Sequence, residues 1–64
     1  MTVNGQPFEI EAGSTVTALL ARLGAPPEGV AVAINNEVVP RREHSTRVLH
    51  PEDRVEVIRA VGGG

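Results

Sequence analysis

The apolar residues of this chain change their spacing once, and this change restricts the folds that the chain can adopt. In the segment "GSTVTALLARLG" they stand at i, i+3, i+4 and i+7, which is one stripe of a helix: Val16, Leu19, Leu20 and Leu23. Ser14 or Thr15 can cap the start of this helix, and Gly24 can end it in a left-handed conformation. Before and after this segment the apolar residues alternate, so the pattern predicts a single helix among strands.

Two short strands are predicted before the helix, in "MTVNGQPFEIEA". The dipeptide Asn4-Gly5 between them is a strong hairpin signal, because both residues accept positive φ at little cost. The hairpin then turns three apolar side chains toward one face of the sheet: Val3, Phe8 and Ile10.

After the helix, "VAVAINNEVVP" predicts a third strand and a short fourth one around a turn at Asn35-Asn36. The third strand alternates between two sets of apolar residues: Val30, Val32 and Ile34 on one side, Ala31 and Ala33 on the other. Residues 41–53 have no clean period, and we expect a turn and a brief edge segment that carries Val48 and Leu49, without defined boundaries.

The last strand is predicted in "DRVEVIRA", where apolar residues alternate again. Val55 and Val57 face one side of it, and Glu56, Ile58 and Ala60 face the other. One helix against one face of a small mixed sheet is an α+β fold. At 64 residues the chain can build one core, so we expect one domain over residues 1–61 and a flexible tail over residues 62–64.

Composition argues against several classes of protein. The chain has no cysteine, which excludes disulfides and Cys-ligated zinc. Its net charge is −2, and its one phenylalanine is its only aromatic residue among Phe, Trp and Tyr, so we expect no nucleic-acid partner. It has neither the start of a signal peptide nor the roughly 20 apolar residues that span a bilayer. We therefore expect a cytoplasmic protein without a membrane partner.

No motif for catalysis or for metal binding appears in the sequence. It contains neither of the glycine-rich patterns that bind nucleotides. His44 and His50 are expected to be surface histidines rather than metal ligands, and Glu52-Asp53 to form a solvated turn. We therefore expect no catalytic residue, no metal, no cofactor bound by this chain, and no enzyme activity of its own.

The chain closes with "RAVGGG", in which Gly62, Gly63 and Gly64 bring no apolar atoms to offset the entropy of ordering. Fully extended, three residues project a terminal carboxylate roughly 10 Å beyond Val61, through a slot too narrow for side chains. The carboxylate is unreactive until it is activated, for example by acyl-adenylation in a partner that holds ATP and Mg²⁺. The alternative at this point is an ordinary loose end.

The whole chain resembles the ThiS family of sulfur carrier proteins, in the ubiquitin-like β-grasp group. The most specific segments are "AINNEVVPR", which is similar to the family's A-x-N-x-x-x-V-P-R run, and the final Gly-Gly after an apolar strand. The resemblance implies a β-grasp fold in which Gly64 is adenylated and becomes a thiocarboxylate, while Gly62 and Gly63 thread into the partner. It implies an E1-like, ThiF-type adenylyltransferase, a sulfur-donating protein and a ThiG-type thiazole synthase that makes the thiazole of thiamin.

A carrier also needs a docking face, which we place on the open face of the sheet. The residues expected there are Ile58, Ala60, Ala31, Ala33 and Val39, flanked by Arg41. Alternatives remain open at this level: the same chemistry can serve tRNA thiolation, molybdopterin synthesis or protein modification. A rival from another class is a β-grasp binding module without a reactive end.

Overall fold

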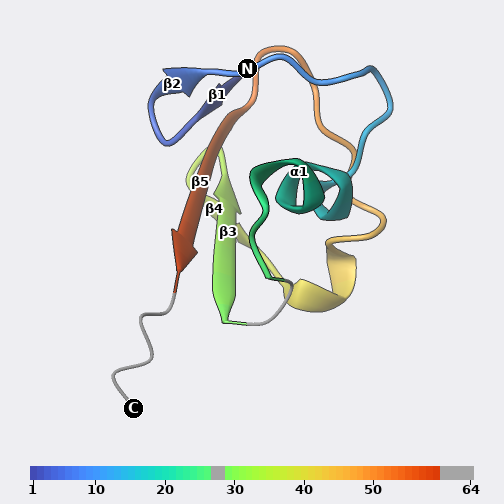
Figure 1. Cartoon of the computed structure of the whole chain (residues 1–64), viewed down its shortest axis with the longest axis vertical. Helices are drawn as coiled ribbons and strands as arrows, with labels where there is room; N and C mark the ends of the chain where they lie inside the picture. Colours follow the sequence, from blue (N-terminus) through green and yellow to red (C-terminus); the bar gives the residue numbers. More distant parts are fainter. Residues whose placement is uncertain (27–28, 60–64) are drawn as a thin grey trace.

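The computed structural model describes residues 1–26 and 29–59 of the chain. This described part contains five strands, one α-helix and one short 3-10 helix (Figure 1). In chain order they are β1 (Thr2–Val3), β2 (Gln6–Pro7), α1 (Val16–Leu23), β3 (Val30–Ile34), β4 (Glu37–Val39), η1 (Arg41–Glu43) and β5 (Arg54–Arg59). The predicted order of two strands, a helix and three strands is therefore confirmed.

The strands form one mixed sheet with the spatial order β2-β1-β5-β3-β4. The first and last strands of the chain, β1 and β5, run parallel at the centre, and all other neighbours are antiparallel. Helix α1 packs on one face of this sheet (Figure 1). The α+β prediction is confirmed, and β5 has a strand on each side.

Both hairpins use residues in the left-handed region, where asparagine and glycine are favoured. Asn4 has φ 52° and Gly5 has φ 82°, while Asn35 and Asn36 have φ 52° and 70°. The two-residue turns fix the register, with Val3 opposite Gln6 and Ile34 opposite Glu37. Turn chemistry read from the sequence therefore predicted both hairpins correctly.

Helix α1 begins and ends as the sequence predicts. The Thr15 hydroxyl accepts a hydrogen bond from the Ala18 N–H at 3.3 Å, which identifies Thr15 rather than Ser14 as the cap. Gly24 ends the helix with φ 69°. The apolar stripe faces the sheet, and its member Leu23 is partly buried against the core. Among the described residues, nine buried side chains form this core: Val3, Val16, Leu19, Leu20, Val32, Ile34, Val39, Leu49 and Val55.

The segment between β4 and β5 contains little regular structure beyond η1. Val48 forms an isolated bridge with Thr15, so the expected edge segment pairs with the residue before the helix instead of extending the sheet. Leu49 is buried and closes the core at this end. In the part of the chain that the structure describes, no helix has the length and apolarity needed to cross a membrane.

Candidate functional site

The candidate site surrounds the end of β5, the strand that leads into the glycine run. Strand β5 pairs with β3 from Val55, opposite Ile34, to Arg59, opposite Val30. Ala60, Gly62, Gly63 and Gly64 lie outside the described residues, so the structure does not test the roles predicted for them, nor the boundary between domain and tail.

The other side of β5 is held by β1 and then by the side chain of Asn4. The Asn4 backbone N–H donates to Val55 O at 2.8 Å. Its side-chain Oδ1 accepts from the Val57 N–H at 2.9 Å, and its Nδ2 donates to Val57 O at 3.3 Å. The asparagine amide thus replaces a strand residue where β1 has ended, and it fixes β5 to within two residues of its end.

The face of the sheet opposite the helix carries an exposed apolar patch. We call Ala31, Ala33, Val38 and Ile58 the open-face patch. Ile58 is 61% exposed and lies opposite Ala31, and Val38 is 75% exposed and lies opposite Ala33. Glu56 lies opposite Ala33 on the same face, so one carboxylate borders the patch. The expected exposure of Ile58 is confirmed, and Arg41 is also exposed, at the start of η1.

The prediction that Val39 belongs to this face is wrong. Val39 is 7% exposed and lies in the core. The two-residue turn places Val39 opposite Val32, and directly opposed residues of neighbouring strands share a face, which here is the helix side. Val38, one position earlier, takes the place on the open face that was expected for Val39.

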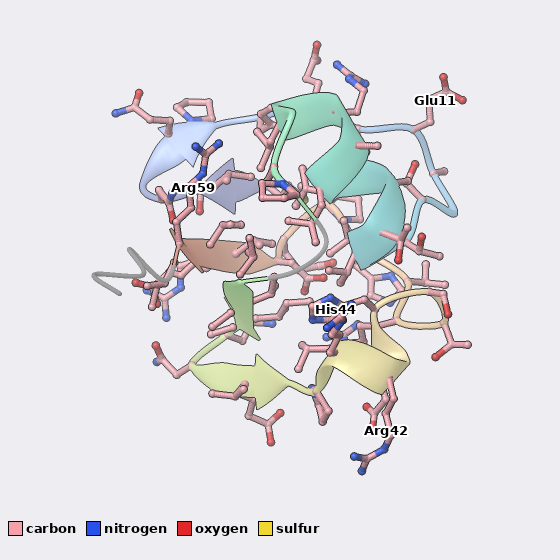
Figure 2. All side chains as sticks on the ribbon, turned by 60° about the horizontal axis from the view of Figure 1, so that its bottom comes forward. Glu11, Arg42, His44 and Arg59 are labelled. Atoms are coloured by element: carbon pink, nitrogen blue, oxygen red, sulfur yellow. The ribbon has the colours of Figure 1, made fainter. Side chains whose placement is uncertain are left out.

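His44 and Asp53 are buried, contrary to the expectation of a surface histidine and a solvated turn. The His44 ring nitrogen Nε2 donates to Val39 O at 3.1 Å, and His44 O accepts from the Thr17 N–H at 3.0 Å (Figure 2). His44 therefore connects β4 to the first turn of α1, which is a structural role.

The Asp53 carboxylate is the centre of a second buried connection. Its Oδ2 accepts from the His50 N–H at 2.9 Å, and its Oδ1 accepts from Asn35 Nδ2 at 3.1 Å. Asn35 Oδ1 in turn accepts from the Arg54 N–H at 3.0 Å. These bonds join the β3–β4 turn to the start of β5. Within residues 1–26 and 29–59, no group of three or more His, Cys, Asp or Glu side chains could hold a metal ion.

Comparisons with known proteins agree on one family. A family model described as the ThiS family matches residues 1–64. The chain is 33% identical over 61 residues to the sulfur carrier protein ThiS of Escherichia coli. This match covers 95% of this chain and 92% of that protein. The crystal structure of a thiamine biosynthesis protein (ThiS) from Geobacter metallireducens matches with a TM-score of 0.83 and 36% identity, covering 98% and 96% of the two chains. This match confirms the ubiquitin-like β-grasp fold.

Two longer proteins also match. The chain is 45% identical over 62 residues to a thiazole synthase of Magnetococcus marinus and 34% identical over 64 residues to one of Paramagnetospirillum magneticum. The matches cover 97% and 100% of this chain. The chain spans only about a fifth of the length of these relatives, 19% and 20%.

Proposed function

Because the chain belongs to the ThiS family, we propose that it is a sulfur carrier whose Gly64 carboxyl group is converted to a thiocarboxylate. The observation that carries this proposal is the match over the whole chain, which includes the glycine run after β5. The chain acts as the substrate of its partners and is not itself a catalyst.

The chemistry requires two steps at one carbonyl carbon. A Gly64 carboxylate oxygen attacks the α-phosphorus of ATP in the adenylating partner, which forms an acyl–phosphate bond and releases pyrophosphate. A hydrosulfide-level sulfur nucleophile then attacks the carbonyl carbon, AMP leaves, and the sulfur's proton passes to solvent. ATP and Mg²⁺ belong to the partner, a ThiF-type adenylyltransferase, and the sulfur comes from a separate donor protein.

Gly62 and Gly63 serve to thread Gly64 into the partner, because residues without Cβ atoms pass through a slot that other residues would block. The open-face patch next to the end of β5 serves as the docking surface. Ile58 and Val38 are exposed apolar side chains. Their burial by a partner is favourable, because it removes apolar surface from water. Arg41 remains a proposed flanking contact.

We assign the sulfur to the thiazole of thiamin, with a ThiG-type thiazole synthase as its recipient. The matches to two thiazole synthases support this choice over tRNA thiolation, molybdopterin synthesis or protein modification. The similarity to the thiamine biosynthesis protein of Geobacter metallireducens supports the same choice. Because adenylation consumes ATP, we expect the reaction in the cytoplasm.

The test is the intact mass of the protein isolated from its own cells without strong nucleophiles. We expect a species in which one oxygen has been exchanged for one sulfur, with the change mapped to Gly64. A variant that lacks Gly63 and Gly64 is the control, and it should stay folded and unmodified. An unmodified mass that persists after incubation with cell extract, ATP, Mg²⁺ and sulfide would refute the carrier and favour a binding module.

A further inference from the structure

A hollow lies on the helix side of the sheet, next to the end of β5. Its volume is about 460 Å³. Apolar side chains from the hairpin, the end of α1 and β5 form most of its lining: Val3, Phe8, Leu23, Ala25 and Val57. Asn4, Gln6 and Arg59 complete the lining. This hollow and the open-face patch lie on different faces of the sheet, so they are two separate surfaces.

The backbone of β5 offers an open edge at this hollow. The backbone groups of Val55 and Val57 bond to Asn4 on this side, whereas Arg54 O accepts from the Asn35 N–H on the other side. Backbone groups alternate sides along a strand, so those of Arg59 face the hollow. Among the described residues, no hydrogen bond engages Arg59 on this side. Within the described residues, the pairing on this side therefore stops at Val57, and β5 can accept another strand at Arg59.

Two arginines make the rim of the hollow positive. Arg59 lies beside the β1–β2 hairpin (Figure 2) and is exposed. The Arg22 guanidinium carbon lies 5.6 Å from the ring centroid of Phe8, which is itself part of the lining. None of the described residues that line the hollow is acidic. On a chain with a net charge of −2, this rim is a local positive site.

We propose that this hollow binds an extended acidic segment of the adenylating partner, added as a strand to β5. An apolar side chain of that segment fills the hollow, carboxylates beside it face Arg22 and Arg59, and its backbone pairs with Arg59. The five residues that follow Arg59 must enter the same partner for Gly64 to react. The inference thus rests on the proposed function and adds a second contact, opposite the open-face patch.

Four single substitutions test the proposal in matched pairs. Arg59→Glu reverses a rim charge, and Arg42→Glu makes the same change on η1, on the other side of the molecule (Figure 2). Ala25→Leu fills part of the hollow, and Ala21→Leu makes the same change on the exposed side of α1. The melting temperature of each variant shows whether it folds. Arg59 and Arg42 are both exposed, so the charge pair stays informative if Ala25→Leu is unstable.

The assay is pyrophosphate release by the ThiF-type adenylyltransferase of the same organism, with the chain as the varied substrate. We expect Arg59→Glu and Ala25→Leu to raise KM by roughly tenfold or more with little change in kcat, because they weaken docking and leave the tail intact. Arg42→Glu and Ala21→Leu should stay within about twofold of the unaltered chain. In the complex, the Arg59 amide should exchange its hydrogen more slowly than in the free chain.

The outcomes separate this inference from the proposed function. If the adenylyltransferase releases no pyrophosphate with the unaltered chain as substrate, the proposed function fails and this inference fails with it. If the unaltered chain is adenylated, but both hollow variants keep their KM and the Arg59 amide stays unprotected, only the hollow is excluded as a docking site. An equal rise in KM for Arg59→Glu and Arg42→Glu would indicate a general charge effect and would also overturn the inference.

Discussion

The side chain of Asn4 supports β5 with two hydrogen bonds, and Asn4→Gly removes both. Glycine accepts the φ of 52° at this position, so the turn itself can form as before. The variant loses the acceptor for the Val57 N–H and the donor to Val57 O. Asn36→Gly is a matched control: Asn36 has φ 70° in the other hairpin, and no hydrogen bond of its side chain occurs within the described residues.

The prediction concerns the difference in the free energy of unfolding between the two variants, because the effects of glycine on the turn and on the unfolded chain occur in both. Each hydrogen bond is exposed, so its contribution to stability lies at the low end of the usual range for one hydrogen bond, about 0.5–1 kcal/mol. Asn4→Gly should therefore lower the free energy of unfolding by about 1–2 kcal/mol more than Asn36→Gly. For a domain of this size, the corresponding difference in melting temperature is roughly 4–16 °C.

Urea denaturation and calorimetry of both variants measure this difference, and hydrogen exchange locates it. The Val57 amide should lose protection in Asn4→Gly and keep it in Asn36→Gly, since Val57 is the residue that Asn4 bonds. A difference in unfolding free energy below about 0.3 kcal/mol, with the Val57 amide still protected, would refute the reasoning. The asparagine amide would then not replace a strand residue in solution.

Two further substitutions test the open-face patch and the buried carboxylate. Ile58→Asp should leave the melting temperature nearly unchanged, since Ile58 is 61% exposed, but it should slow adenylation. The control Ser45→Asp, at an exposed residue, should not slow adenylation. An unchanged rate in Ile58→Asp would exclude Ile58 from the docking face. Asp53→Ala removes an acceptor used by two donors, so urea denaturation should show a loss of about 2–4 kcal/mol. Glu52→Ala, at the exposed neighbour, should change stability by less than about 0.5 kcal/mol, and equal losses in the two variants would contradict the assignment.

The parts of the fold that local sequence patterns control were predictable. The stripe that includes Leu19 and Leu20 defined the helix, and Gly24 marked its end, because both signals lie within a few residues of each other. Asn4-Gly5 and Asn35-Asn36 marked the hairpins by their tolerance of positive φ. Alternation also placed Val55 in the core and Ile58 outside it.

Val39 was misplaced although the sequence held the information needed. In "NNEVVP" two consecutive valines follow the turn, and alternation alone does not say which one faces the core. A two-residue turn pairs Ile34 with Glu37 and therefore Val32 with Val39, which fixes the face. Counting residues across the turn would have identified Val38 as the exposed valine.

The buried polar residues could not be predicted from local patterns. Asp53 bonds to Asn35, 18 positions away, and His44 reaches both Val39 O and the Thr17 N–H. Such contacts depend on which loops the fold brings together, and a short polar motif carries no period that reveals them. The hollow beside Arg59 was missed for the same reason, since residues from the hairpin, the end of the helix and β5 line it.

The central position of β5 also has a mechanical consequence for a domain that is held by its tail. A force that pulls on residues beyond Arg59 acts along β5, whose bonds to β1 and β3 lie across the direction of pulling. Those bonds must break together in shear, whereas an edge strand can peel away one bond at a time. Two neighbouring strands therefore share the load, and a partner could drag the tail out of a tight channel without unravelling the domain that carries it.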